Sequence, residues 1–181
     1  SEAVHASDAV IGRQQTIYAQ YRNLLNLPAG LSRQDMVLQA LAVTGLQDAQ
    51  LAIILSLQTR QVQRTMLALR EKYGVQNRAQ LINLAFDQDL VAAEEAIFDQ
   101  TTIKKVDGLE GEEKELFWRI VRGEMNKEIS QQLRWEINKT KPRIRALMDK
   151  FEDRVVIETR EQLVIIGNKY NKYKKRGPST R

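Results

Sequence analysis

An internal repeat constrains the fold of this chain of 181 residues more than any other feature of its sequence. Residues 31–85 align with residues 109–167 without a gap for about 43 residues, and apolar or small positions coincide along the alignment. In this gapless part, each residue of the first copy aligns with the residue 78 positions later, so that Gly45 aligns with Gly123. The second copy then has about four extra residues, after which aligned residues are 82 positions apart. We call residues 31–85 the first unit and residues 109–167 the second unit.

Hydrophobic periodicity predicts an all-α fold. Apolar residues recur every three or four positions along nearly the whole chain, and no segment shows the alternation typical of a strand. Only three prolines and nine glycines interrupt the pattern, which favours short connections between helices.

Each unit is predicted to contain four helices in the same order. A helix ends at Gly45 or Gly123, where a residue without Cβ adopts positive φ easily. A short helix follows, with Asp48 or Asn126 as the expected N-cap. A tight turn leads to a longer helix, and a last short helix begins near residue 77 or 159. The first three helices are expected at residues 33–43, 48–55 and 59–73, and at residues 112–122, 126–133 and 137–151.

Three further segments lie outside the two units. Residues 1–30 are predicted to hold a helix at residues 9–25, which Pro28 and Gly30 end. Residues 86–108 form an acidic linker with a short helix at residues 90–98. Because a 55-residue unit is marginally stable alone, we expect both helices to complete the cores of the units. A dimer seam along Ile17, Tyr18, Tyr21 and Leu25 is the alternative for the first helix.

The net charge of +5 comes from the C-terminal end of the chain. Residues 168–181 hold six basic residues and no acid, so the rest of the chain carries a net charge of −1. A nucleic-acid partner must therefore be argued from local clusters, and the two longer helices at residues 59–73 and 137–151 carry them. We expect the basic tail to add sequence-independent attraction to phosphate, or a disordered arm in the minor groove.

Composition excludes several classes of function. The chain has no cysteine and one histidine, which argues against disulfides, thiolate nucleophiles, Ser–His–Asp catalysis and zinc sites. The longest apolar stretch is about five residues, whereas a membrane-spanning helix needs about 20. We therefore expect a cytoplasmic protein with no cofactor and no metal.

The order of short helix, tight turn and longer basic helix is that of a helix-turn-helix, whose second helix enters the major groove. Residues 123–130 read Gly-Glu-Met-Asn-Lys-Glu-Ile-Ser, and residues 72–78 read Lys-Tyr-Gly-Val-Gln-Asn-Arg. These segments resemble the G-x-S-N-K-E-I-A and K-L-x-V-x-N-R segments of LuxR/FixJ-type helix-turn-helix regulators, and residues 109–116 resemble their L-T-x-R-E-x-E-V-L segment. The first unit departs from the pattern at residues 48–52, which read Asp-Ala-Gln-Leu-Ala.

The resemblance implies two tandem four-helix LuxR-type units and a bacterial transcription regulator, such as an activator, that binds double-stranded DNA sequence-specifically. It implies no enzymatic activity, and it implies that Asp35 pairs with Arg78 and Glu113 with Arg160. Exposed polar residues of the longer helices become the DNA-binding candidates, with arginine and lysine suited to guanine or phosphate and glutamine or asparagine to adenine. The candidates are Thr59, Arg60, Gln61, Gln63, Arg64, Arg70 and Lys72 in the first unit, and Asn138, Lys139, Lys141, Arg143, Arg145 and Lys150 in the second.

Pro142 falls inside the longer helix of the second unit, where proline removes a backbone donor and clashes with the preceding turn. Either this helix starts late, with Thr140 as its N-cap, or it is kinked at Pro142. Trp135 in the turn and the extra residues Glu152 to Val156 also set the second unit apart. We therefore expect the first unit to read bases better than the second.

The predicted function is a transcription regulator associated with the nucleoid. Double-stranded DNA is the expected partner, and RNA polymerase, a partner regulator, a homodimer or a heteromer are further expectations. An adaptor or anti-activator built on degenerate helix-turn-helix folds is the main alternative, and a sigma-factor-like promoter reader is a third. Trp118 marks a protein contact in the adaptor hypothesis, whereas packing under the N-terminal or linker helix is the other interpretation. The acidic linker is expected to approach the basic helices when DNA is absent.

Overall fold

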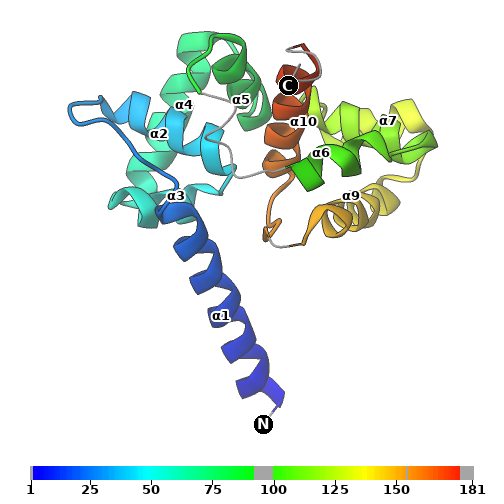
Figure 1. The fold of residues 1–181 in the computed structure, drawn as a ribbon, viewed down its shortest axis with the longest axis horizontal. Coiled ribbons are helices and arrows are strands. Elements are labelled where there is room, and N and C mark those ends of the chain that lie inside the picture. The colour runs from blue at the N-terminus through cyan, green and yellow to red at the C-terminus, as the bar shows by residue number, and fades with distance from the viewer. Residues whose placement is uncertain (1, 92–99, 154, 176–181) are drawn as a thin grey trace, which may run out of the picture.

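The computed structural model describes residues 2–91, 100–153 and 155–175, without the side chains of residues 2–7 and 100. This part of the chain forms ten helices and no strand, which confirms the all-α prediction (Figure 1). The helices are α1 (Glu2–Arg22), α2 (Arg33–Thr44), α3 (Asp48–Leu55), α4 (Thr59–Tyr73), α5 (Arg78–Asp87), α6 (Gln100–Asp107), α7 (Gly111–Val121), α8 (Asn126–Leu133), α9 (Ile137–Phe151) and α10 (Arg160–Lys175).

The six helices predicted at the start of the two units agree with the structure to within one residue at each end. Gly45 and Gly123 adopt positive φ values of 64° and 86°, as predicted. The N-caps of α3 and α8 are Gln47 and Met125, so the assignment of Asp48 and Asn126 as caps was wrong by one position. Asp48 and Asn126 are instead the first residues of α3 and α8, and their side chains bond to Arg78 and Arg160.

Pro142 lies inside α9, because this helix begins at Ile137. The prediction of a late start with Thr140 as N-cap was therefore wrong. Thr140 is fully buried, and its Oγ1 donates to the carbonyl of Glu136 over 3.4 Å within the helix. Pro142 has no N–H, so the carbonyl of Asn138 four residues earlier loses its helical partner.

The segments outside the units differ more from the predictions. α1 begins at Glu2 and ends at Arg22, earlier than expected, and Figure 1 shows it extending away from the rest of the molecule. The helix predicted at residues 90–98 lies almost wholly outside the described residues. α10 continues to Lys175, so the first eight residues of the basic tail are helical and do not form a disordered arm.

One pair of contacts recurs in both units at aligned positions. Arg78 at the start of α5 bonds to the carboxylate of Asp48 and to the carbonyl of Leu46. In the second unit, Arg160 at the start of α10 bonds to Oδ1 of Asn126, and its Nη2 donates to the carbonyl of Glu124 over 2.8 Å. In each unit the arginine therefore ties the last helix to the start of the short one.

These contacts correct two predicted ion pairs. Arg78 meets Asp48 rather than Asp35, whose backbone N–H is capped by Ser32 Oγ at 3.1 Å at the exposed start of α2. Glu113 binds Lys150 instead of Arg160. The physical reason is the same in both units, because the arginine lies over the start of the short helix and away from the start of the first.

Two reciprocal hydrogen bonds join the units. Asn77 Nδ2 of the first unit donates to the carbonyl of Gly123 over 2.9 Å, and Thr159 Oγ1 of the second unit donates to the carbonyl of Gly45 over 2.5 Å. Asn77 aligns with Thr159 and Gly45 with Gly123, so the two contacts are equivalent. Such reciprocity is the mark of an isologous interface around an approximate two-fold axis. We call these four residues the junction.

Buried polar groups extend the contact between units. α5 packs against α10 (Figure 1), and Asn168 Nδ2 donates to Asn83 Oδ1 over 2.6 Å. Gln162 is fully buried; its Nε2 donates to Tyr21 Oη over 2.5 Å and to the carbonyl of Thr44 over 3.2 Å. Gln162 Oε1 accepts from the N–H of Thr159 over 3.0 Å. Gln162 thus links α1, the end of α2 and the start of α10.

The C-terminal part of α1, from Arg13 onward, contacts both units. Its Ile17 and Tyr21 are fully buried, which confirms the core role predicted for these two residues. Arg13 lies 2.9 Å from carboxylate oxygens of both Glu152 and Glu158. Tyr21 Oη donates to the carbonyl of Val156 over 3.5 Å. The extra residues of the second unit therefore form the surface on which α1 rests.

Within the described residues, none of the helices has both the length and the apolar composition to cross a membrane by itself. The α2–α3 pair passes the same test of length and composition when taken together, with a bend of 115° between its members.

The closeness of the units at the junction predicts the effect of a single methyl group. A Cβ on Gly45 would lie 2.9 Å from Cγ and 3.0 Å from the backbone N of Gln162, and φ is +64°. We expect Gly45→Ala to lower the free energy of unfolding by about 2–5 kcal/mol, which combines left-handed strain with overpacking. Urea titrations of both variants measure these free energies. Gly74 also has positive φ but open space around it, so Gly74→Ala should lower the free energy of unfolding by only about 1–2 kcal/mol. Equal costs would contradict a tight junction.

Candidate nucleic-acid interface

The turn between the short and the longer helix is the same in both units. Residues 56–58 join α3 to α4, and residues 134–136 join α8 to α9. The first turn residue, Ser56 or Arg134, has a positive φ of 55° or 56°. Both side chains are exposed. A residue with left-handed backbone at this point turns the chain sharply. α4 therefore follows α3 in the first unit through the same kind of turn by which α9 follows α8 in the second.

α4 buries one face and exposes the other. Val62, Thr65, Met66 and Leu69 face the core of the first unit. Seven residues of α4 are exposed, and all of them except Leu67 and Glu71 were predicted site residues: Thr59, Arg60, Gln63, Arg64, Leu67, Glu71 and Lys72. The helical period of 3.6 residues therefore produces a mainly polar strip of the kind that reaches base edges.

The two arginines of this strip lack an ion-pair partner in the described part of the chain. Neither Arg60 nor Arg64 forms an ion pair with any residue that the structure describes, and the one acid of α4 is Glu71, near its C-terminal end. Both guanidinium groups remain available to an anionic partner. The first unit thus presents two unneutralised arginines one turn apart.

The other predicted residues of the first unit are engaged within the protein. Gln61 Oε1 accepts from the N–H of Gln58 over 2.9 Å in a capping box at the start of α4. Arg70 Nη1 donates to the carbonyl of Gln76 over 3.4 Å. Lys72 Nζ lies 5.2 Å from the ring centroid of Tyr73. These contacts place Arg70 and Lys72 near the end of α4, away from Arg60.

The second unit differs, because acids accompany most of its predicted cations. Nitrogen–oxygen distances are 3.7 Å for Lys139–Glu136, 3.2 Å for Arg143–Glu112 and 3.3 Å for Arg145–Asp149, and Lys150 binds Glu113. The guanidinium of Arg143 also lies 4.1 Å from the ring centroid of Trp135. Lys141 and Asn138 are exposed, and neither is in such a pair among the described residues.

Sequence reasoning missed Leu67 and the junction. Leu67 is 51% exposed on the same strip as Arg60 and Arg64, and an apolar side chain there suits a thymine methyl group. The repeat aligns it with Arg145, which was a predicted site residue, so the signal was present. Asn77 and Thr159 were expected only at the starts of helices, and nothing local indicates their bonds across the two units.

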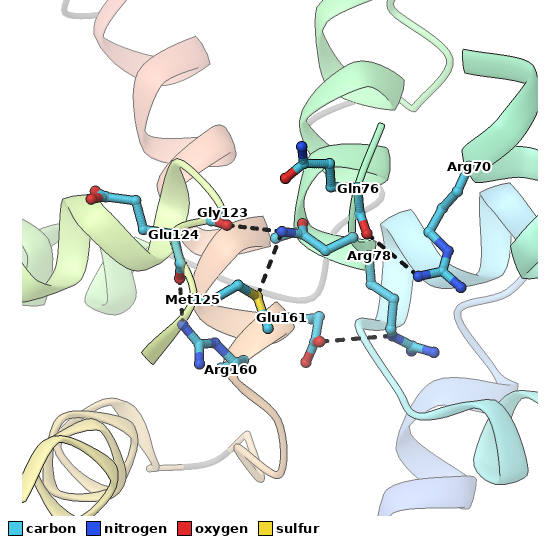
Figure 2. Close-up of a pocket in the computed structure, with 10 residues that line it drawn as sticks. Arg70, Gln76, Arg78, Gly123, Glu124, Met125, Arg160 and Glu161 are labelled. Carbon is cyan, nitrogen blue, oxygen red and sulfur yellow. Dashed lines mark hydrogen bonds and ion pairs between the residues drawn. The ribbon is translucent and has the colours of Figure 1, made fainter. Parts of the chain in front are cut away.

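The junction is hollowed on one side into a cavity of about 380 Å³. Figure 2 shows Arg78 beside Glu161, at 3.7 Å, and Arg160 bonded to the carbonyl of Glu124. Burial lowers the pKa of Arg160, although the nearby Glu161 opposes this effect. Arg70 also lines this cavity, and its Nε is buried without a hydrogen-bond partner in the described part of the chain. Among the described residues, no cluster of three or more histidine, cysteine, aspartate or glutamate side chains is suited to a metal.

Two acids of the acidic linker, Asp89 and Asp107, meet the end of α10. Asp89 lies 2.5 Å from Lys172, Asp107 lies 3.4 Å from Lys174, and Tyr170 Oη donates to Asp107 over 2.6 Å. The expectation that the linker approaches the basic helices was therefore wrong for these two acids. They neutralise part of the basic tail.

Trp118 is partly buried and packs inside the second unit. Its ring centroid lies 5.0 Å from that of Phe117 and 5.7 Å from that of Tyr170 in α10. Trp118 therefore packs against other side chains, as expected, but the aromatic residue that it meets outside α7 is Tyr170 of α10 and not a residue of the N-terminal helix. This contact removes one argument for a protein-binding surface at Trp118.

Comparison with known proteins yields no match: no family model, no curated protein and no solved structure resembles the chain significantly.

The contact between linker and α10 predicts a pH dependence. The hydrogen bond from Tyr170 and the charge of Lys174 hold the pKa of Asp107 below its ordinary value of 3.8. A lowered pKa in the folded state adds stability above the ordinary value, and this stability is lost as the pH falls through the lowered pKa. We expect Asp107→Asn to lower Tm at pH 7 and to have no effect at a pH below the lowered pKa.

The matched control is Asp87→Asn, which removes an exposed aspartate that forms no ion pair with the described residues. Thermal unfolding followed by circular dichroism at several pH values checks the prediction. A Tm difference that stays constant from pH 7 into the acid range, or that Asp87→Asn reproduces, would contradict it.

Proposed function

We propose that the chain is a transcription regulator of the LuxR/FixJ-like kind that binds double-stranded DNA sequence-specifically through two helix-turn-helix units. The observation that carries the proposal is the exposed strip of α4, with Arg60 and Arg64 free of carboxylates, at the end of a short helix and a tight turn. In a helix-turn-helix, this is the position of the helix that enters the major groove.

The junction supports a specific mode of binding. Its reciprocal bonds relate the two units by an approximate two-fold axis, which also relates α4 to α9. Dimeric helix-turn-helix proteins use the same symmetry to place two recognition helices in successive major grooves, about 34 Å apart. Here one chain supplies both helices, so a homodimer is not required for a two-part site.

Phosphate contacts position such a protein, and base contacts specify its sequence. Arg60, Gln63 and Arg64 are the proposed base readers of the first unit, since arginine pairs with guanine and glutamine with adenine in the major groove. Lys141 and Asn138 take this role in the second unit. Arg70, Lys72 and Lys150 are proposed phosphate contacts, the last after release from Glu113.

An adaptor or anti-activator remains the second candidate function. The acids that accompany the cations of α9 favour it, because a neutralised helix face suits a protein partner better than DNA. An adaptor does not need to bind DNA sequence-specifically, whereas the proposed regulator does. Sequence-specific DNA binding is therefore the property that distinguishes the two functions.

Binding selection on random duplexes tests the proposal. We expect the full chain to enrich one motif, and Arg60→Ala/Arg64→Ala to weaken binding to that motif by about 10²-fold, at 1–3 kcal/mol for each lost contact. With six to ten phosphate contacts, log K should fall against log salt with a slope of roughly −5 to −9.

The control is Arg22→Ala/Arg33→Ala, which removes the same charge from exposed positions on α1 and α2. This variant should retain the motif and lose little affinity. Absence of any enriched motif, or an equal loss in both variants, would contradict sequence-specific reading by α4 and would favour the adaptor.

A further inference from the structure

The two longer helices occupy equivalent places in the repeat, but their cations lie at different positions, and more of the cations on α9 are paired with carboxylates. Positions 60, 63, 64 and 67 of α4 align with positions 138, 141, 142 and 145 of α9. Two of these four positions hold an arginine in α4, namely Arg60 and Arg64. The aligned residues in α9 are Asn138 and Pro142, so neither arginine has a counterpart.

The other two aligned positions of α9 hold Lys141, which forms no ion pair within the described structure, and Arg145. Most cations of α9, unlike Arg60 and Arg64, are paired with carboxylates. Arg143 and Lys150 reach back to Glu112 and Glu113 at the start of α7, and Arg145 pairs with Asp149 one turn later. The aligned positions of α2 in the first unit, 34 and 35, hold Gln34 and the exposed Asp35, and neither forms an ion pair with α4 among the described residues.

These carboxylates oppose phosphate binding in two ways. Each occupies a cation that a phosphate would otherwise bind, and each adds a negative charge close to the approaching backbone. Exposed ion pairs stabilise a protein by only about 0–1 kcal/mol, so folding gives little reason for these three pairs on α9. Their effect on a polyanion is larger, because binding to DNA depends on the number of phosphates that the protein neutralises.

We propose that the two units bind DNA unequally. α4 specifies a strong half-site, and α9 contributes a weakly specified half-site with few phosphate contacts, so the operator is asymmetric although the protein frame is nearly symmetric. This inference rests on the proposed DNA binding and adds to it the form of the DNA site. The carboxylates of Glu112 and Glu113 limit the second unit.

A gain of binding tests the inference better than a loss. Glu112→Gln/Glu113→Gln frees Arg143 and Lys150 while the hydrogen-bonding capacity of both side chains is kept. We expect this variant to bind the duplex selected by the unchanged protein about tenfold more tightly at low salt, and the salt slope to steepen by about 2, for two added phosphates. Fluorescence anisotropy titrations over a range of salt concentrations measure both quantities.

Two further variants complete the test. Asp8→Asn/Asp87→Asn raises the net charge equally, and neither residue is in an ion pair within the described structure, so its salt slope should not change. Pro142→Arg gives α9 the arginine that α4 has at the aligned position, and the motif that it selects should gain sequence information in its weaker half. Thermal unfolding of each variant verifies that it is folded.

The outcomes separate this inference from the proposed function. A motif with one well-specified half, together with the gain in the glutamine variant, supports unequal binding. Two equally specified halves, or a gain no larger than that of the control, would overturn the inference and leave DNA binding intact. A protein that selects no motif would overturn the proposed function itself.

Discussion

The hydrogen bonds at the junction hold the two halves of the molecule in one arrangement. Each uses a backbone carbonyl at the end of the first helix of one unit and a side chain at the start of the last helix of the other. Glycine at positions 45 and 123 makes this approach possible, since both have positive φ and a Cβ would lie within 3.1 Å of the other unit. Separated units would expose both carbonyls to water, so each of these hydrogen bonds contributes only about 0.5–1.5 kcal/mol net to holding the units together.

The remaining elements are arranged around this contact. Gln162, which lies beside the junction, bonds to Tyr21 of α1. Glu152, one of the extra residues of the second unit, forms an ion pair with Arg13 of α1. α1 therefore braces one side of a nearly symmetric core, and the repeat has diverged where α1 contacts it. The charges diverge as well, because the acids at the start of α7 reach α9 while those of α2 do not reach α4.

Periodicity and the repeat predicted the helices well, because 3.6-residue spacing, glycine ends and short turns are local properties of the chain. The partners of Arg78 and Arg160 were predicted wrongly, since several acids lie within reach in sequence and only tertiary packing selects Asp48 and Asn126. The exposed residues of α4 followed from its helical face. The ion pairs of α9 did not, because Glu112 and Glu113 come from another helix.

We propose that one chain presents two recognition helices in a fixed, nearly two-fold frame. The mass of the complex between the full chain and the duplex that it selects, measured by native mass spectrometry or sedimentation, tests this most directly. We expect one chain on each duplex, and we expect the bound protein to protect the DNA over two successive major grooves on the same face. Two chains on each duplex, or protection confined to a single groove, would contradict it.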